Sequence, residues 1–223
     1  GLREDKIETI PNGVDFSLFS PAPMEQARAL LGLPSDKRII LFVGNLTENK
    51  GLLPLLRAFQ LVRQRRRDVL LTLVGHGPLQ VELKQKALQY GLKDCALFAG
   101  PQVQSQLPFW YNSADLVVLP SFSEGRPNVV LEAMACGKPV VASDIPGIRE
   151  LAWEGSAVSL FRPGDSARMA EAILKVIKEP ARENDQQMRK HLMDLGLTWE
   201  RCAERYIECY RRARKDAGCA EGQ

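Results

Sequence analysis

The sequence predicts an α/β fold of the doubly wound, Rossmann-like class, in which helices cover both faces of a parallel sheet. Short apolar runs rich in β-branched residues, typical of strands buried on both faces, alternate with longer segments of helical periodicity. The alternation continues along the chain without a long linker or a low-complexity tract. Because right-handed crossovers place helices on both faces of such a sheet, the doubly wound class follows.

The expected strands are bounded by glycine, proline or polar residues, and each is short and apolar. They cover residues 39–43, 69–74, 96–99, 116–119, 139–143 and 157–161. The segments between and after them have helical spacing of apolar residues and little glycine or proline. The expected helices cover residues 52–66, 79–90, 107–114, 128–135, 166–178, 182–195 and 199–215.

Individual elements have their own signals. Gly44 ends the first strand, and the following helix has an apolar stripe from Leu52 to Val62 with arginines at its C-terminal end. The turn from Gly75 to Pro78 separates the second strand from its helix. Pro127 is acceptable at the first position of the helix over residues 128–135, because its missing N–H has no partner there.

Composition indicates one compact domain. The chain has 223 residues, 45% of them hydrophobic, which is the size and content of one globular unit. No apolar run approaches the length of a membrane span. The net charge of +3 does not demand a polyanionic partner, and five cysteines without a close Cys-x2-Cys pair suit a reducing cytoplasm. Since Gly1 is preceded by neither Met nor a signal peptide, we expect it to mark a domain boundary.

Two glutamates eight residues apart, Glu124 and Glu132, are the main candidates for a binding site. The spacing alone indicates little, because Glu171 and Glu179 repeat it in a charged helical segment. Context separates the pairs: Glu124 comes just after a buried strand, and Glu132 lies in the N-terminal half of the next helix. Ligands of open α/β sheets bind outside the carboxyl ends of the strands, where the first helical turn also offers free N–H groups.

This stretch resembles a known family. The two glutamates, followed by Ala-Met-Ala-Cys-Gly-Lys-Pro-Val-Val at residues 133–141, are similar to the donor-binding signature of retaining, nucleotide-sugar-dependent glycosyltransferases of the GT-B fold, family 4 or group 1. The resemblance extends from Ile10 to Trp199 and beyond, but it covers only the C-terminal half of such an enzyme. It implies that residues 1–223 form the donor-binding domain. Residues 1–20 would then be a remnant of the interdomain linker, and the helix over 197–215 would cross to the missing N-terminal domain.

The resemblance also implies roles for the residues around the signature. Glu132 would accept hydrogen bonds from ribose hydroxyls and Glu124 from the donor hexose, while the loop backbone surrounds the sugar and phosphate. That loop consists of Gly125, Arg126, Pro127, Asn128 and Val129. Alternatives stay open: Glu124 as a glutamate stabilised by the helix dipole, Arg126 as a surface side chain, and Asn128 as a capping or first-turn residue.

The segment from Gly44 to Gly51 is the candidate diphosphate loop. It follows the first strand and opens a helix, where glycine permits close backbone approach and a lysine adds charge. The order of a Walker A loop is absent. In the resembled family this loop supplies an arginine and a lysine; Lys50 matches the lysine, whereas Asn45 stands in place of the arginine and halves the available side-chain charge. Without that role, Lys50 is a solvated lysine at a helix start.

Two further positions are candidates through the resemblance. Gly75 belongs to a Gly-x-Gly-Pro turn that lies beside the nucleotide in the family, and the backbone at Leu97 would meet the base. His76 in the same turn is either a ligand contact or a loop histidine without a role. By itself the glycine pattern is only half of a dinucleotide fingerprint.

Other functional classes find little support. No Asp-x-Asp motif is present, and His76 and His191 lie far apart, which argues against a zinc site or a Ser-His-Asp triad. The arginines over residues 63–67 indicate a solvated helix end more than a contact with anionic lipid or nucleic acid, and no aromatic platform accompanies them.

We therefore interpret the chain as the nucleotide-sugar-binding domain of a retaining glycosyltransferase of saccharide assembly, in which Glu124 and Lys50 serve the transfer of a hexosyl group. No metal or other cofactor is expected; the donor is a substrate, and a saccharide or lipid-linked acceptor would bind through the missing half. The alternatives are half of an epimerase of the same fold and a catalytically silent binding module, which Asn45 favours. We expect a cytoplasmic protein, with peripheral contact at the inner face of the membrane left open for the full-length enzyme, no nucleic-acid partner, and no transfer by the isolated chain.

Overall fold

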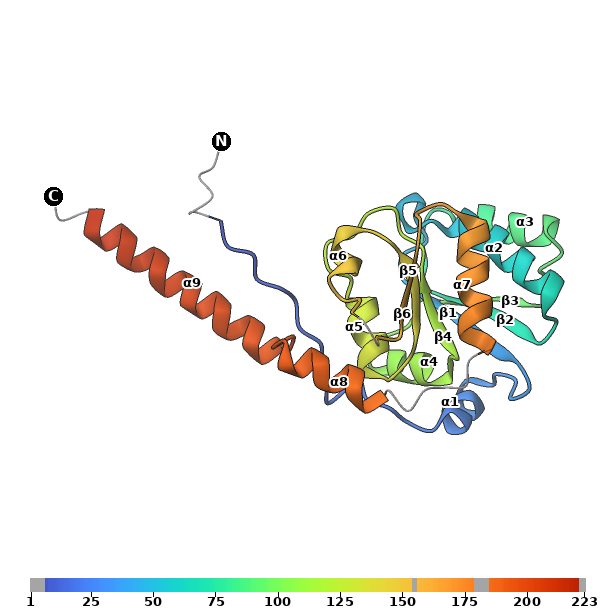
Figure 1. Cartoon of the computed structure of the whole chain (residues 1–223), viewed down its shortest axis with the longest axis horizontal. Coiled ribbons are helices and arrows are strands. Elements are labelled where there is room, and N and C mark those ends of the chain that lie inside the picture. The colour runs from blue at the N-terminus through green and yellow to red at the C-terminus, as the bar shows by residue number, and fades with distance from the viewer. Residues whose placement is uncertain (1–6, 154–155, 179–184, 221–223) are drawn as a thin grey trace.

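The computed structural model describes residues 7–153, 156–178 and 185–220. Within them, six parallel strands form one sheet in the order β3-β2-β1-β4-β5-β6 (Figure 1). The strands are β1 (Arg38–Val43), β2 (Val69–Val74), β3 (Ala96–Gly100), β4 (Leu116–Leu119), β5 (Val140–Ser143) and β6 (Val158–Phe161). The prediction of a doubly wound parallel sheet is confirmed.

Helices cover both faces of the sheet. They are α1 (Met24–Leu31), α2 (Leu52–Arg65), α3 (Gln80–Gln89), α4 (Leu107–Ser113), α5 (Asn128–Ala135), α6 (Pro146–Arg149), α7 (Ser166–Lys178), α8 (Asp185–Asp194) and α9 (Trp199–Ala220). Single 3₁₀ turns occur at η2 (Glu48–Lys50) and η3 (Gln104–Gln106). Helices α2, α3 and α7 pack on one face, whereas α4 and α5 lie on the other.

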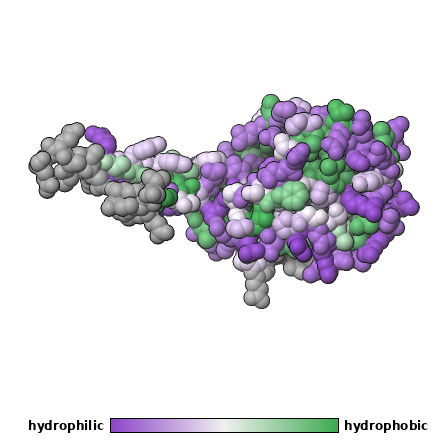
Figure 2. Space-filling view, turned by 90° about the horizontal axis from the view of Figure 1, so that it is seen from above, coloured by the Kyte–Doolittle hydropathy of each residue, from purple (hydrophilic) through white to green (hydrophobic). Residues whose placement is uncertain are grey.

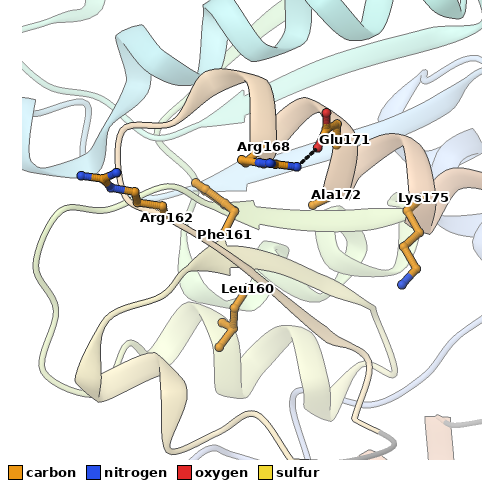
Figure 3. Close-up of a pocket in the computed structure, with 7 residues that line it drawn as sticks. All are labelled: Leu160, Phe161, Arg162, Arg168, Glu171, Ala172 and Lys175. Atoms are coloured by element: carbon orange, nitrogen blue, oxygen red, sulfur yellow. Dashed lines mark hydrogen bonds and ion pairs between the residues drawn. The ribbon is translucent and has the colours of Figure 1, made fainter.

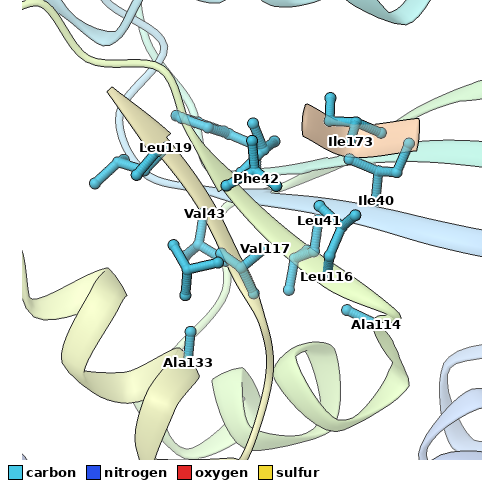
Figure 4. Packing of buried hydrophobic residues seen from close by; sticks show 14 of the residues in the cluster. Ile40, Leu41, Phe42, Val43, Ala114, Leu116, Val117, Leu119, Ala133 and Ile173 are labelled. Carbon is cyan, nitrogen blue, oxygen red and sulfur yellow. The ribbon is translucent and has the colours of Figure 1, made fainter. Parts of the chain in front are cut away.

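The core fills both sides of the central strands. In Figure 4, Ile173 of α7 lies on one side of the sheet and Ala133 of α5 on the other, with Leu41 and Val117 between them. All of these side chains are buried. Because β1, β2 and β4 are apolar on both faces, they can occupy only the middle of a covered sheet.

The predicted elements agree with the structure to within one residue at most ends, but some elements were missed. Helix α1 begins after Pro23 and ends at Gly32 in the left-handed region (φ 64°), and its weak apolar pattern gave no signal. Helix α6 is a single turn beginning at Pro146. Helix α9 continues beyond its predicted end to Ala220, and the predicted start of α8 at Arg182 lies outside the described residues.

A buried ion pair fixes the N-terminal ends of β1 and β4. Arg28 of α1 donates from Nη2 to Asp115 Oδ2 (2.7 Å) and from Nε to the Ser113 carbonyl (2.9 Å). Asp115 also accepts from the backbone N–H of Ile39 (2.6 Å) and from Arg38 Nη1 (2.8 Å). This cluster joins α1, the end of α4 and the starts of both strands. The sequence pattern had shown Asp115 only as the polar start of a strand.

The N-terminal segment packs on the domain from Val14 onward. The backbone of Val14 forms an isolated bridge with Thr198, and its N–H donates to the Leu197 carbonyl (3.0 Å). Phe19 is buried in the core, and Arg189 of α8 donates to its carbonyl (2.7 Å). Residues 14–22 therefore belong to the packed domain.

Helix α9 extends away from this body, and residues 7–13 run beside it (Figure 1). Figure 2 shows the same narrow extension leaving the rounded body. Arg205 of α9 donates to the Thr9 carbonyl (3.0 Å), and Arg212 pairs with Glu8. The aromatic side chains Trp199, Tyr206 and Tyr210 of α9 are 40%, 45% and 66% exposed. None of the helices in the described ranges is long and apolar enough to span a membrane.

Replacing Arg28 with Ala should destabilise the fold strongly. The change leaves Asp115 buried without its main partner, and breaking one side of a buried pair costs about 3–5 kcal/mol. Urea unfolding followed by circular dichroism measures the difference. Arg168→Ala is the matched control, because Arg168 forms an exposed pair worth under about 1 kcal/mol. Equal losses for the two variants would contradict a structural role for the buried cluster.

Candidate functional site

The strand order reverses between β1 and β4, which makes this the switch point of the sheet. The chain builds outward from β1 to β2 and β3 on one side, and from β4 to β5 and β6 on the other. The β1–β4 ladder consists only of Ile40 paired with Leu116 and Leu41 paired with Val117. Phe42 and Val43 therefore extend beyond that ladder toward the carboxyl ends. Ligands of open α/β sheets bind outside the strands at such a point.

Two loops leave the sheet there and meet through an ion pair. Lys50, at the end of the loop after β1, lies with its Nζ 2.5 Å from Oε1 of Glu124, in the loop after β4. The Lys50 and Glu124 side chains are 23% and 14% exposed, so the pair is largely shielded but reachable. Asn49 links the same loops, since its Nδ2 donates to the Ser123 carbonyl (2.9 Å) and its own carbonyl accepts from the Phe122 N–H (2.8 Å). The structure thus brings together the two residues predicted to be catalytic.

The loop after β2 packs against the first of these loops. Gly75 has φ 135°, and a Cβ there would lie 1.9 Å from the Gly44 carbonyl oxygen, so only glycine fits. The Leu46 N–H donates to the His76 carbonyl (2.8 Å). The side chains of Asn45 and His76 are both exposed. The predicted Gly44, Asn45 and Gly75 therefore form one side of the loop cluster.

Glu132 lies in the second turn of α5 and accepts a hydrogen bond from a buried tyrosine. The Tyr111 hydroxyl, fully buried, donates to Glu132 Oε2 at 2.6 Å. Burial raises the pKa of Glu132, and the hydrogen bond from Tyr111 opposes that rise. Burial and then the charge of Glu132 raise the pKa of Tyr111 well above its usual value, so the hydroxyl stays protonated as the donor.

The remaining loop residues surround the N-terminus of α5. The Arg126 Nη2 pairs with Glu150 Oε2 (2.7 Å), and its Nε is buried without a partner in the described part of the chain. Pro127 has extended backbone angles and precedes the helix, so its expected place inside the first turn is wrong by one residue. Asn128 opens α5 without capping it and accepts a hydrogen bond from Asn12 Nδ2 (3.2 Å) at Oδ1. Val129 follows it in the first turn and is half-buried.

The position of the Gly125 backbone depends on Gly147, a residue that was not predicted from the sequence. A Cβ on Gly147 of α6 would lie 1.3 Å from the Gly125 carbonyl oxygen, so α6 sits directly against the loop backbone. Any side chain at position 147 would displace the loop that holds Glu124. A Pro-Gly pair such as the one that begins α6 is typical of turns, but only the tertiary contact gives Gly147 this role. Tyr111 was also missed, because a tyrosine in an aromatic run predicts core packing.

Leu97 lies away from this cluster. Its backbone is paired with Thr72 at the second residue of β3, three residues before the end of that strand. At the usual rise of a strand this places it about 10 Å from the carboxyl edge. Its side chain is partly exposed on the outermost strand of that side of the sheet.

A hollow of about 370 Å³ lies elsewhere, beside β6 and α7 (Figure 3). Its lining includes Phe161, Arg162 and Lys175, together with Arg168 and Glu171, which form an ion pair with each other. None of the predicted site residues lines this hollow. No group of three or more His, Cys, Asp or Glu side chains suited to a metal occurs among residues 7–153, 156–178 and 185–220.

A parallel sheet of this order, with one cation and two carboxylates on the loops and helix beyond its switch point, is a Rossmann-like α/β domain of the kind found in GT-B enzymes. The chain belongs to the family described as glycosyl transferases group 1, whose model matches residues 23–192. The resemblance seen in the sequence is thereby confirmed.

Known proteins similar to the chain are glycosyltransferases and enzymes of related fold. A D-inositol 3-phosphate glycosyltransferase of Arthrobacter sp. (strain FB24) is 35% identical over 94% of this chain and 51% of its own length. The structure of sucrose-phosphate synthase from Thermosynechococcus elongatus aligns with a TM-score of 0.84 at 31% identity, covering 94% of this chain and 53% of that one. The structure of Anabaena HepE in complex with UDP and glucose aligns with a TM-score of 0.82 at 27% identity, covering 95% and 58%. The chain thus spans about half the length of these relatives.

Replacing Glu132 with Gln should change stability in a pH-dependent way. Because burial raises the pKa of Glu132 in the folded chain, folding favours the protonated carboxyl. The stability that the protonated Glu132 carboxyl contributes is fully present below its unfolded-state pKa and is lost as the pH rises through its folded-state pKa. We therefore expect Glu132→Gln to gain stability relative to the parent as the pH rises. The free energy of unfolding of the variant minus that of the parent should be larger at pH 8 than at pH 5. Urea unfolding at both pH values measures it.

Glu208→Gln, at an exposed position of α9, is the control for loss of one negative charge. If Glu132→Gln instead loses stability relative to the parent as the pH rises, the burial argument is contradicted.

Proposed function

We propose that the chain is the donor-binding domain of a retaining glycosyltransferase that transfers a hexosyl group from a nucleoside diphosphate. The observation that carries the proposal is the Lys50–Glu124 pair across the switch point, with Glu132 in the helix that follows Glu124. Family membership supports it, as does similarity to a protein whose structure was determined with UDP and glucose.

Each charged group has a distinct role in this proposal. Lys50 is a compact cation at the edge of the sheet and would stabilise the charge that develops on the departing diphosphate. Glu124 would accept hydrogen bonds from the hexose and Glu132 from the ribose. The backbone N–H groups of Asn128 and Val129 have no helical partner at the start of α5, and together with the N–H of Gly125 in the preceding loop they would bind phosphate or sugar oxygens.

Acceptor binding and catalysis would need a second domain. The chain covers about half of the glycosyltransferases that it resembles, and a cleft closed by two domains excludes water and strengthens electrostatic interactions. Helix α9, with exposed Trp199, Tyr206 and Tyr210, would contact that N-terminal domain. The isolated chain would bind the donor weakly and transfer nothing. The acceptor would be a saccharide or lipid-linked sugar, and the complete enzyme would work in the cytoplasm, with peripheral membrane contact for a lipid-linked acceptor.

A catalytically silent nucleotide-sugar-binding module is the second candidate. Asn45 favours it, because an exposed neutral side chain stands where the resembled family has an arginine for the diphosphate. The two candidates differ when the N-terminal half is restored: an enzyme hydrolyses or transfers the bound donor, whereas a module only binds it.

A thermal-shift screen tests the shared part of the proposal. UDP-, GDP- and ADP-hexoses are each added to the chain, and the unfolding temperature should rise for at least one base. A ligand that binds only the folded state stabilises it by about 2.7 kcal/mol at a concentration of 100 times its Kd. If none of the three bases shifts the transition at millimolar concentration, the donor-binding role is wrong.

Lys50→Ala should weaken binding of the preferred nucleoside diphosphate at least about tenfold, which is 1.4 kcal/mol. The same change should leave binding of the nucleoside nearly unaltered, because a cation on a phosphate contributes nothing to ribose or base. Calorimetric titration measures both ligands. Lys175→Ala removes the same charge from α7, at the hollow away from the loops, and serves as the control. Equal losses for nucleoside and nucleotide would mean that the loop itself is disturbed.

Glu124→Gln should have opposite effects on two ligands. Removing the carboxylate frees Lys50 and reduces repulsion of the diphosphate, so the nucleoside diphosphate should bind several-fold more tightly. The nucleotide-hexose should lose that advantage, because the sugar loses an ionised acceptor worth roughly 1.5–3 kcal/mol. The ratio of the two dissociation constants is the readout. Glu48→Gln, at an exposed acid in the loop that carries Lys50, controls for charge alone. An unchanged ratio would remove Glu124 from the hexose site.

A further inference from the structure

Tyr111 occupies a position that core packing alone does not require. It lies on α4, before β4, whereas Glu132 lies on α5, after β4. Its ring is fully buried and packs edge-on against Phe19, with ring centroids 5.8 Å apart. A phenylalanine would fill the same volume. The hydroxyl instead reaches Glu132 Oε2 at 2.6 Å, the short distance typical of a hydrogen bond to a charged oxygen.

The two oxygens of Glu132 are in different situations. Oε2 accepts from Tyr111, whereas no other hydrogen bond to this carboxylate is found within the described ranges. Glu132 is only partly buried, and Oε1 is not among the buried side-chain atoms without a partner in the described ranges, so this oxygen keeps contact with solvent. A side chain bound at one oxygen and open at the other is already oriented for a ligand. A freely rotating carboxylate would lose rotamer entropy on binding, which lowers affinity.

We propose that Tyr111 is a positioning residue that fixes the rotamer of Glu132 and leaves Oε1 to accept a hydrogen bond from a ribose hydroxyl of the nucleotide. This inference rests on the proposed donor-binding function. Tyr111 does not touch the ligand; it acts through Glu132. Its second effect is electrostatic: the hydroxyl favours the ionised carboxylate in a setting where burial favours the protonated one.

The groups around the pair allow the pH dependence to be interpreted. Cys136, at the C-terminal end of α5, is buried and its thiol pKa is raised to about 12, so it does not titrate in the working range. Lys138 Nζ donates to the Asn112 carbonyl (3.1 Å), and Arg189 donates to the Phe16 and Phe19 carbonyls. Tyr111 itself stays protonated. Glu132 is then the group among these whose raised pKa makes its charge sensitive to acidification.

The test compares Tyr111→Phe with the parent by calorimetric titration of UDP, GDP and ADP, using whichever the parent binds. Tyr111→Phe should bind it about tenfold more weakly at pH 7. On acidification, Tyr111→Phe should also lose its affinity at a higher pH than the parent does. Without the hydroxyl the pKa of Glu132 rises, so its carboxyl is protonated earlier as the pH falls. Tyr90→Phe, at a half-buried tyrosine outside the site, should change neither quantity.

A double-mutant cycle separates positioning from a general structural effect. In a Glu132→Ala background, Tyr111→Phe should alter affinity less than twofold, because its effect passes through the carboxylate. An equal loss in both backgrounds, or a parent-like pH profile in the single variant, would overturn the positioning role. If the parent binds the nucleotide and Tyr111→Phe binds it equally well, only this inference fails. If the parent binds none of the three, the proposed function fails and this inference with it.

A second form of the experiment preserves the fold if Tyr111→Phe unfolds. Expression with 3-fluorotyrosine keeps every hydroxyl but makes each a stronger donor. The loss of nucleotide affinity on acidification should then move to lower pH. No movement, in a labelled protein whose circular dichroism matches the parent, would contradict the proposal.

Discussion

The short pairing between β1 and β4 is the constraint on which the rest of the structure depends. At their N-terminal ends the two strands are held by Asp115, which binds the Ile39 backbone and the Arg28 guanidinium together. The ladder then covers only two residue pairs, whereas β1 and β2 pair along six. The strands are thus joined firmly at one end only. Their carboxyl ends carry the two loops that hold Lys50 and Glu124.

The charged groups at the two ends of these strands serve opposite purposes. Arg28 has an acceptor for each of its three nitrogens and stabilises the fold as a buried group with its hydrogen bonds satisfied. At the other end, Lys50 and Glu124 neutralise each other while remaining partly exposed, and Glu132 has a single donor, Tyr111. Such groups keep hydrogen-bonding capacity for a ligand at some cost in stability. The contrast distinguishes the structural cluster around Arg28 from the candidate site better than burial alone.

How much could be predicted from the sequence depended on whether a feature was local. Strands such as β1 and β2 were found because continuous apolar runs need no partner to be recognised. Glu124 and Glu132 were predicted as site residues from their place after a strand and within a helix, not from their spacing, and their roles stay predictions. Tyr111, Gly147 and Arg28 were not found as site or network residues, because each acts through a contact with a segment distant in the sequence. A one-turn helix such as α6 has too few residues for periodicity to appear.

The base of helix α9 is where the proposed donor-binding domain would connect to a second one. A Cβ on Gly13 would lie 2.1 Å from the Thr198 backbone, and Val14 bridges to the same residue, so the incoming segment and the start of α9 are fixed together. Beyond that point Arg205 and Arg212 join residues 8 and 9 to the helix. The N-terminal segment and helix α9, which are both proposed to reach the other domain, therefore leave the body of this domain at the same point. Since Arg189 ties the same N-terminal segment to α8, and α8 packs on α5, a movement at this base would reach the helix that carries Glu132.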